Sequence, residues 1–476
     1  MPRRIDAPLR KPDANLRRNE NVVRRPTLAI DVGTSGSSAV LVTSERDILV
    51  EDPHAGGSVW PTSVAYDGTS PRVGAAAEGF GRVHPDKHLG RLKQFLGEPG
   101  KLVLGEGSFT AAELAGWLLA EMREQAERVG GVEATRAVIT VPASYRAGDP
   151  RRDALLEAAA RAGFTTVELL YEPLATVEAP IIGGSFAIGD LGLVIDFGAG
   201  STTAALISVL KNGTVELLGH DERTECSGAE IDRLIMTELL ARAGRTWSDY
   251  TRHSDDPAQR MRTARSRRAL EDRARAMKHQ LSVHPSAIEL IGPDEVPVEL
   301  TAGELTKIIA PSLLKSVDSF RAMLNTRGVR MTELAAVVLS GGGSRLPITE
   351  DVVTDTFHRP VRHTVDQQRA AAEGAARFAR SIERRHVRAR VATDKETPLR
   401  WDLPGGHATD LEWQLEPGAR FGASDALAVA RLDDGSLWEL RPGRTGTLVR
   451  THAATGANIN SGDWLVTVEL DIRPFR

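Results

Sequence analysis

Two copies of one short pattern, at residues 28–41 and 193–206, hold the residues of this chain that are best suited to phosphate chemistry. In each copy an apolar run ends in an aspartate, a glycine-rich turn follows, and a second apolar run completes the pattern. Glycine permits positive φ and close approach of the backbone, so such a turn can point its N–H groups at phosphate oxygens. The two aspartates, Asp31 and Asp196, are placed to hold a magnesium ion or a water beside those phosphates.

The two copies keep the same spacing throughout. Asp31 matches Asp196, and the following residues match at equal offsets as far as Leu41 and Leu206. A single Asp-x-Gly after a strand is usually an ordinary turn, whereas two in register indicate a duplicated domain that closes on one nucleotide. The candidate phosphate-binding residues are Gly33, Thr34 and Ser35 in the first loop and Gly198, Ala199, Gly200 and Ser201 in the second.

Predicted strands and helices that would position these loops alternate between residue 26 and about residue 379, which is typical of the α/β class. Thr110 and Glu113 have the spacing of a capping box at the start of a helix. The predicted long helices are at residues 262–281, a strongly basic segment, and 305–324, and the predicted buried strands are at residues 137–141 and 335–339.

The 476 residues are too many for one hydrophobic core, and the composition divides the chain into four parts. Residues 1–25, rich in Arg, Pro and Asn, are predicted to be a disordered basic tail. Residues 26–380 contain both copies of the pattern and are predicted to be the nucleotide-binding domain, and residues 381–397 are a charged linker. Residues 398–476, with four of the seven tryptophans and short strands broken by Gly, Pro and Asp, are predicted to be a small all-β domain.

Bulk composition excludes several classes of protein. The net charge of −4 gives no reason to expect binding to nucleic acid or to a membrane surface. No apolar run is long enough for a membrane span, and the N-terminus lacks the apolar segment of a secretory signal. The single cysteine, Cys226, excludes an internal disulfide. We therefore expect a cytoplasmic protein without a membrane or nucleic-acid partner.

Seven motifs occur in the same order as in a known family. They are the two loops described above and residues 92–97, 139–143, 171–175, 339–347 and 373–376. Together they resemble the ATPase domain of the 70-kDa heat-shock (DnaK-type) chaperones, within the actin/sugar-kinase superfamily. The resemblance implies a duplicated actin-like (ribonuclease H-like) domain of two lobes, which binds ATP or ADP with Mg²⁺ between them.

The resemblance also implies roles for single residues. Asp31 and Asp196 would organise the magnesium shell and orient the attacking water, and Lys93 would supply a positive charge near the γ-phosphate. The implied catalytic residues are Lys93, Glu172, Asp196 and Ser201, and the implied nucleotide-binding residues beyond the loops are Gly228, Lys278, Ser282, Gly341, Gly342 and Arg345.

The chain departs from the family at several positions. Thr203 stands where the family has an aspartate that helps to hold the metal's water shell, so we expect weaker magnesium binding or slower hydrolysis. Ser201 replaces a threonine but keeps the hydroxyl, and Arg275 stands where the family has an acidic adenosine contact. Nucleotide binding is therefore expected to be retained, whereas efficient turnover is not.

The predicted C-terminal domain has a repeat of its own. Residues 418–427 recur as residues 456–465, at an offset of 38, and the two halves resemble the biotinyl/lipoyl-type barrel-sandwich fold. Carrier proteins of that fold need a lysine on the central hairpin, here residues 433–435, and no lysine follows Lys395. We therefore exclude a biotin or lipoate carrier and expect a small β module for docking or for intramolecular packing, whose tryptophans are mostly core residues.

Two interpretations of function follow. In the first, the chain is an ATP-binding, chaperone-like protein of protein folding that slowly hydrolyses ATP with Mg²⁺ and couples opening and closing of its lobes to an unidentified partner or client protein. In the alternative, it is a nucleotide-bound scaffold or switch with little or no turnover, which binds a partner through the C-terminal β domain. A metabolite kinase and an actin-like filament protein are the remaining alternatives within the superfamily.

Overall fold

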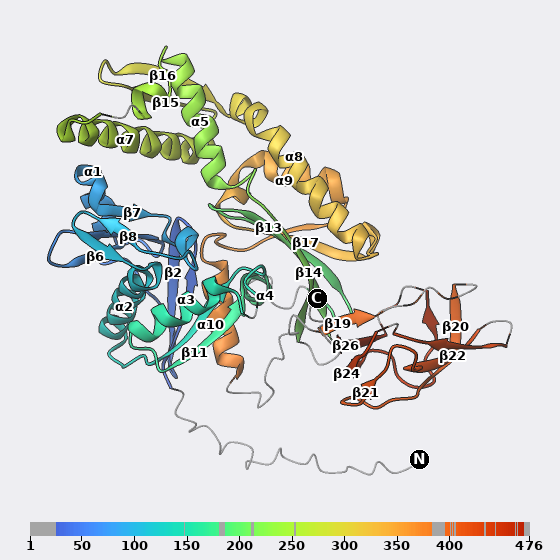
Figure 1. Ribbon diagram of the computed structural model, residues 1–476. Helices are drawn as coiled ribbons and strands as arrows, with labels where there is room; N and C mark the ends of the chain where they lie inside the picture. Colours follow the sequence, from blue (N-terminus) through green and yellow to red (C-terminus); the bar gives the residue numbers. More distant parts are fainter. Residues whose placement is uncertain are drawn as a thin grey trace, which may run out of the picture.

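The computed structural model describes residues 25–146, 148–179, 186–210, 214–251, 254–382, 396–399, 401, 403, 406–432, 435–442, 444–461, 463 and 465–470. The predicted N-terminal tail, except for Arg25, and most of the predicted charged linker lie outside these residues. The described elements form two lobes, each built on its own sheet, and a further set of strands from residue 396 onwards (Figure 1). None of the described helices is both long and apolar enough to cross a lipid bilayer.

The sheet of the first lobe has the order β11-β10-β1-β2-β3, with β4 beside β2. Its strands are β1 (Thr27–Val32), β2 (Gly36–Val42), β3 (Asp47–Leu49), β4 (Trp60–Pro61), β10 (Arg136–Val141) and β11 (Thr166–Tyr171). β1 and β2 form an antiparallel hairpin, and β10 runs parallel to β1. β1 is buried along nearly its whole length, as expected for a strand that has neighbours on both sides and layers on both faces.

The sheet of the second lobe repeats this arrangement in the order β14-β13-β12-β17-β18. Its strands are β12 (Leu191–Phe197), β13 (Thr202–Val209), β14 (Val215–Arg223), β17 (Leu334–Ser340) and β18 (Val361–His363). In both hairpins the loop aspartate faces the equivalent residue of the second strand: Asp31 lies opposite Ser38, and Asp196 lies opposite Thr203. The predicted duplication is therefore confirmed down to the strand register.

Helices cover both sheets, and their caps set their starts. α2 (Ala111–Gly130) and α3 (Pro150–Arg161) belong to the first lobe, and α8 (Ala302–Thr326) and α9 (Pro347–Phe357) to the second (Figure 1). The predicted capping box of α2 is present, because the Thr110 hydroxyl accepts from the Glu113 N–H and the Glu113 carboxylate accepts from the Thr110 N–H. α8 begins earlier than predicted, because Thr301 and Glu304 form a second capping box there.

Two helices lie where the lobes meet at the base of the cleft. They are α4 (Glu172–Glu178) and α10 (Ala370–Ile382). Both contribute to the apolar core of the first lobe, and Val194 and Val338 of the second sheet belong to the same cluster. A Cβ on Gly374 of α10 would lie 1.8 Å from the carbonyl oxygen of Ala175 in α4. The glycine therefore permits a helix contact that no larger residue could make.

Further elements of both lobes face each other across the mouth of the cleft (Figure 1). The first lobe contributes β5 (Ser63–Tyr66), β6 (Pro71–Val73), α1 (Gly74–Val83), η2 (Pro85–Lys87), β7 (His88–Gly90), η3 (Leu92–Phe95), β8 (Leu102–Leu104) and β9 (Gly107–Phe109). The second lobe contributes α5 (Gly228–Arg242), α6 (Ser248–Thr251), α7 (Pro257–Leu281), β15 (Ser286–Ile291) and β16 (Val296–Thr301). The two turns η4 (Met331–Glu333) and η5 (Gly342–Arg345) flank β17. Ion pairs join α1 to α7, Arg82 with Asp272 at 3.2 Å and Arg268 with Glu78, so the lobes touch at the mouth.

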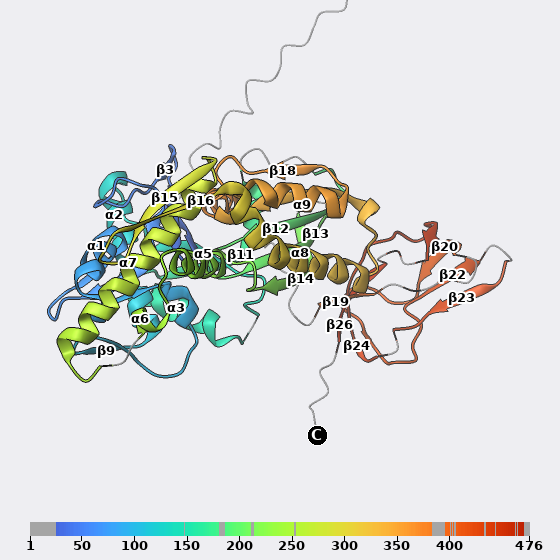
Figure 2. The same ribbon diagram turned by 90° about the horizontal axis from the view of Figure 1, so that it is seen from above.

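Residues 396–470 form two four-stranded antiparallel sheets that stand apart from the lobes (Figure 2). The strands are β19 (Glu396–Leu399), β20 (His407–Trp413), β21 (Arg420–Phe421), β22 (Ala428–Leu432), β23 (Leu437–Leu440), β24 (Gly446–Thr451), β25 (Ile459–Asn460) and β26 (Val466–Leu470). We call this unit the β module. The predicted small all-β region is confirmed, and its first strand begins at Glu396, inside the predicted linker.

The offset of 38 seen in the sequence is also present in the strands of the β module. β20, β21 and β22 correspond to β24, β25 and β26, and the sheet orders β23-β22-β20-β25 and β19-β26-β24-β21 match strand for strand. The short strands are exchanged between the halves, since β21 pairs with β24 and β25 pairs with β20. Neither half can therefore complete its sheet alone. The likeness to the barrel-sandwich fold stays a prediction.

Three of the four tryptophans of the β module are described. Trp401 and Trp413 are half-buried, and their indole N–H groups donate to the carbonyl groups of Arg441 and Ala453. Trp438 instead lies on the edge strand β23 with 40% of its surface exposed, beside Leu437 at 62%. Trp464 lies outside the described residues, as do Asp433 and Asp434 of the predicted hairpin.

Among the described residues, an ion pair joins the β module to the second lobe. Arg450 of β24 contacts Glu216 of the edge strand β14. The Glu216 side chain is only 8% exposed, so the pair is partly shielded from water, and removing one partner would leave a buried charge unpaired.

The contact between α4 and α10 predicts that Gly374→Ala lowers the free energy of unfolding by about 2–3 kcal/mol, because the added methyl group meets backbone rather than a side chain that can move. Thermal or urea unfolding measures the loss. Gly303→Ala in α8 is the matched control, because nothing lies within 4 Å of the added methyl group there. We expect that control to be neutral or to stabilise by up to about 1 kcal/mol. Equal effects of the two substitutions would contradict the close contact.

Candidate functional site

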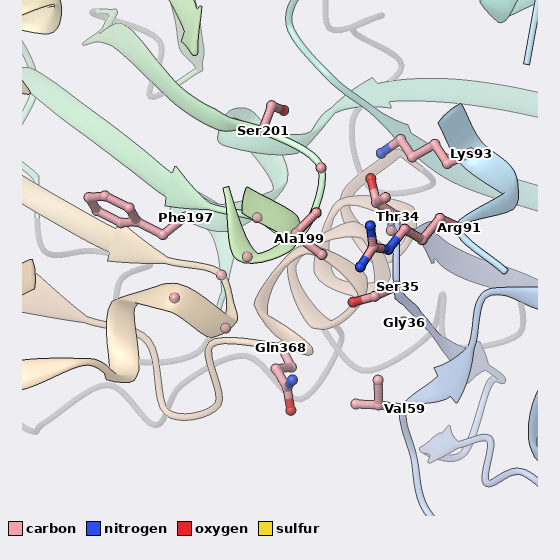
Figure 3. Close-up of a pocket in the computed structure, with 18 of the residues that line it drawn as sticks. Thr34, Ser35, Gly36, Val59, Arg91, Lys93, Phe197, Ala199, Ser201 and Gln368 are labelled. Atoms are coloured by element: carbon pink, nitrogen blue, oxygen red, sulfur yellow. The ribbon is translucent and has the colours of Figure 1, made fainter. Parts of the chain in front are cut away.

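A cavity of about 1050 Å³ lies between the two lobes, and every predicted site residue lines it. The first-lobe residues Thr34, Ser35 and Lys93 face Ala199 and Ser201 of the second lobe across this space (Figure 3). The candidate residues, which are more than 300 positions apart in sequence at the extremes, therefore meet in one place.

The two glycine-rich loops are tight and touch each other. A Cβ on Gly33 would lie 2.2 Å from the carbonyl oxygen of Gly36, and one on Gly198 would lie 2.8 Å from that of Ser201. A Cβ on Gly200 would lie 2.6 Å from the Thr34 hydroxyl oxygen of the other lobe. The loops therefore form opposite sides of a narrow clamp, with backbone close enough to bind an anion.

A hydroxyl group on the neighbouring parallel strand holds each loop aspartate. Thr140 of β10 donates to Asp31, and Ser340 of β17 donates to Asp196. The strand registers place both hydroxyls directly beside their aspartates. Sequence reasoning missed this pair, although a hydroxyl residue at the end of both predicted strands was a signal that could have revealed it.

Three carboxyl groups are crowded at this end of the cavity. Burial, together with the Asp31 carboxylate, raises the pKa of Asp196 to about 6. Burial also raises the pKa of Glu172 to about 7, with a further contribution from the carboxylates of Asp31 and Asp196. Burial raises the pKa of Asp31 as well, although Lys93 and Thr140 oppose that change. The carboxyl groups therefore repel one another when no cation lies between them.

Lys93 provides one positive charge among these carboxyl groups. Its Nζ lies 2.6 Å from Oε1 of Glu172, the first residue of α4. Burial lowers the pKa of Lys93, but the nearby Glu172 and Asp31 carboxylates and Tyr145 outweigh it, so its pKa lies above the usual lysine value. The ammonium group also lies 6.0 Å from the centre of the Tyr145 ring. Lys93 therefore stays charged and is held in place by its own lobe.

The donor set fits a magnesium ion bound largely through water. The carboxyl groups of Asp31, Glu172 and Asp196 exceed the single charge of Lys93 by two. Among the described residues no group of three or more His, Cys, Asp or Glu side chains lies close enough to hold a metal ion directly. Mg²⁺ usually keeps several waters and uses only one or two carboxylates plus phosphates, which is the arrangement that Asp31 and Asp196 could supply.

Thr203 lies in the cavity beside this acidic group. It is opposite Asp196 in the hairpin register, and only 9% of its surface is exposed. A carboxylate at this position would therefore face Asp196 and the predicted magnesium site. The departure seen in the sequence falls at the place where a lost metal contact would matter most.

The other predicted nucleotide-binding residues lie on the second-lobe side of the cavity, which we call the nucleoside end because the resemblance assigns adenosine contacts there. It adjoins the second loop, since the Gly228 N–H donates to the carbonyl oxygen of Gly198 at 2.9 Å. Lys278 contacts Asp232 at 2.6 Å and donates to the carbonyl oxygen of Gly228, and Arg345 contacts Asp366 at 3.2 Å. The Ser282 hydroxyl donates back to the carbonyl oxygen of Lys278 in its own helix, at 3.0 Å.

The close packing of its own turn requires a glycine at Gly341. Its φ is 77°, and a Cβ would lie 2.6 Å from the Phe197 carbonyl oxygen and 2.7 Å from Oδ1 of Asp196. The missing side chain therefore lets the turn at η5 pack on β12. Gly342, by contrast, would direct a Cβ toward Gln368, at 3.4 Å.

Arg91 and Asp232 are cavity residues that sequence reasoning missed. Arg91 has a left-handed backbone with φ of 55°, which is costly for a residue other than glycine and marks a constrained position. Its guanidinium group projects into the cavity (Figure 3), 3.6 Å from the Asp232 carboxylate of the other lobe. Only an unusual φ identifies this residue, and φ cannot be read from sequence.

Comparisons with known proteins agree with this geometry. A family model described as "Hsp70 protein" matches residues 99–411. The chain is 25% identical over 358 residues to "Chaperone protein DnaK" of Elusimicrobium minutum, which covers 73% of this chain and 56% of that protein. It is 27% identical over 377 residues to "Chaperone protein HscA homolog" of Burkholderia mallei, covering 74% and 58% respectively. The chain thus spans less than two thirds of the length of the curated relatives it matches.

The crowded carboxyl groups predict how stability depends on pH in the absence of metal and nucleotide. Because the folded pKa of Asp196 lies above the unfolded value of 3.8, the free energy of unfolding falls as pH rises from about 4 through about 6. In EDTA at pH 7.5, Asp196→Asn should therefore raise the free energy of unfolding by at most about 3 kcal/mol, which is measured as a higher melting temperature. At pH 4 the substitution should give no such gain.

Asp318→Asn, at a side chain that is 58% exposed, is the control and should leave the pH profile unchanged. An equal loss of stability at both pH values in Asp196→Asn would show that the repulsion is not present.

Proposed function

The chain belongs to the Hsp70 protein family, and we propose that it is a chaperone-type protein that binds ATP or ADP with Mg²⁺ in the cleft between its lobes. The observation that carries the proposal is the meeting of both duplicated loops, both loop aspartates and Lys93 around one cavity. Two strand-turn-strand units that face each other form a site for a chain of phosphates, because each turn supplies backbone N–H groups from its own side.

We assign the phosphate end of the site as follows. The loops at Gly33–Ser35 and Gly198–Ser201 bind the β- and γ-phosphates from opposite lobes. Asp31 and Asp196 hold waters of the magnesium shell, and Lys93 offsets negative charge on the phosphate that is transferred. The metal ion, when bound, neutralises phosphate charge and thereby favours attack by water. Transfer to water needs positioning rather than a covalent partner, and the site has the groups to provide it.

We expect hydrolysis to be slow. Thr203 cannot accept from the metal's waters as strongly as a carboxylate would, although it lies in register with Asp196. A nucleotide-bound scaffold or switch with little or no turnover is the second candidate function, and Thr203 is the observation that favours it. Binding and turnover measured on the same sample decide between the two.

We further propose that the β module recognises the partner or client protein. The edge strand β23 exposes Leu437 and Trp438, and an edge strand with apolar side chains is suited to protein contacts. The pair Arg450–Glu216 ties the module to β14, the edge strand of the lobe sheet. Residues 26–380 would bind nucleotide and residues 398–476 would bind the partner. The cytoplasmic location stays a prediction.

Nucleotide binding predicts thermal stabilisation. A ligand that binds only the folded chain adds about 2.7 kcal/mol at a hundredfold excess over its Kd, so ATP and ADP with Mg²⁺ should both raise the melting temperature. GTP and pyrophosphate serve as ligand controls. Absence of any shift with millimolar ATP and ADP would overturn the proposed function.

Thr203→Asp should raise magnesium-dependent ATP turnover by about tenfold, which corresponds to about 1.4 kcal/mol of the barrier. In EDTA the new carboxylate should also lower the free energy of unfolding, because it faces Asp196. Addition of magnesium and nucleotide should restore the lost stability. Thr203→Asn has the same shape without the charge and should do neither. ATP turnover that is already fast in the unaltered chain and unchanged by Thr203→Asp would refute the role given to Thr203.

Lys93→Ala should reduce ATP turnover more than ADP affinity, because Lys93 offsets negative charge on the phosphate that is transferred.

A further inference from the structure

One face of α7 lines the nucleoside end of the cavity. Arg275, Lys278 and Ser282 follow one another at helical spacing, and all three are cavity residues. Arg91 approaches the same region from the first lobe. This end of the cavity therefore receives cations from both lobes, whereas the phosphate end is crowded with carboxyl groups.

The cations near this end are only partly balanced. Arg82 and Arg268 are balanced by Asp272 and Glu78, and Arg345 is balanced by Asp366. Lys278 and Arg91 share a single carboxylate, Asp232, at 2.6 Å and 3.6 Å. Arg275 is half-buried and forms no ion pair within 4 Å among the residues that the structure describes; a carboxylate on which its charge acts, Glu78, already pairs with Arg268. The nucleoside end therefore carries two positive charges in excess.

The excess charges act on one another. Burial lowers the pKa of Lys278, Arg275 and Arg91 lower it further by repulsion, and Asp232 opposes the change. His279 adds little charge near neutral pH, because burial and the neighbouring Lys278 lower its pKa. An adenosine group is neutral and would leave this repulsion in place. An anion at the same point would relieve it.

We propose that the nucleoside end of the cleft binds a second anionic group, so that the preferred ligand is an adenine nucleotide with an additional phosphate on the 2′ or 3′ oxygen of its ribose. The inference rests on the proposed function and on the family resemblance, which assigns Lys278 and the position of Arg275 to the adenosine contacts. Arginine suits this task, since its planar guanidinium group matches two phosphate oxygens at once.

The sequence change at Arg275 points the same way. By the resemblance described above, this position holds an acidic adenosine contact in the family, and a carboxylate there would repel a ribose phosphate. The arginine reverses the charge at that point. This reversed charge is one of the two unbalanced cations at the nucleoside end.

The test compares three ligands by isothermal titration calorimetry at fixed Mg²⁺ concentration: ADP, ADP with a 2′-phosphate and ADP with a 3′-phosphate. We expect at least one of the phosphorylated forms to bind the unaltered chain about tenfold or more tightly than ADP. The difference should shrink as salt is added, because ions screen the charges. The two phosphorylated ligands show which ribose oxygen is recognised.

Arg275→Glu should reverse the preference, so that ADP binds more tightly than either phosphorylated form, and Arg275→Gln should give an intermediate result. Arg267→Glu is the matched control, because it makes the same charge change on the same helix at a side chain that is 56% exposed and outside the cavity. It should leave all three affinities as they are. Circular dichroism verifies that each variant is folded.

Each outcome has a distinct meaning. If none of the three ligands binds, both the proposed function and this inference fail. If ADP binds and the phosphorylated forms bind equally or more weakly, the inference alone fails. If Arg275→Glu weakens all three ligands by the same factor, Arg275 acts as a contact between the lobes, near Glu78, and the proposed anion site is wrong.

Discussion

The need to keep three carboxyl groups and one ammonium group together in a closed cleft governs this structure. Asp31, Glu172 and Asp196 approach one another because two lobes close on a single cavity, and Lys93 balances only one of them. Burial makes each unbalanced charge costly. The strain is partly relieved by hydroxyl donors and by raised pKa values, and a bound cation would relieve the rest. The site is therefore assembled in a form that favours a cation beside these carboxyl groups.

Duplication provides the geometry for this arrangement. In both lobes a hairpin is followed by a parallel strand, and in both a hydroxyl on that parallel strand fixes the loop aspartate. The two copies then diverged in their surroundings: Lys93 and Glu172 come from the first lobe, and Thr203 and Ser201 from the second. The lobes share a core at the base, at α4 and α10, so that their loops meet in a fixed register.

The β module repeats the theme of duplication with a different result. Its halves exchange their short strands, which makes one unit of two repeats. The module reaches the lobes through the shielded pair Arg450–Glu216 on β14, and the far end of the same strand carries Glu222, which lines the cavity. One edge strand thus touches both the module and the cleft.

The sequence by itself determined the elements that depend on local pattern. The two hairpins, the capping box of α2 and the repeat of the β module follow from spacing, because hydrogen bonds and side-chain alternation act over a few residues. The predicted site residues line one cavity, and they were identified by the resemblance of their motifs and positions to the family rather than by local backbone geometry. Only the tertiary structure decided what depends on residues distant in sequence: the hydroxyls of Thr140 and Ser340, the contact of Arg91 with Asp232, the packing role of Gly341 and the excess of positive charge around Arg275. Charge balance and burial are properties of the assembled cleft, and a chain read residue by residue does not contain the distances that set them.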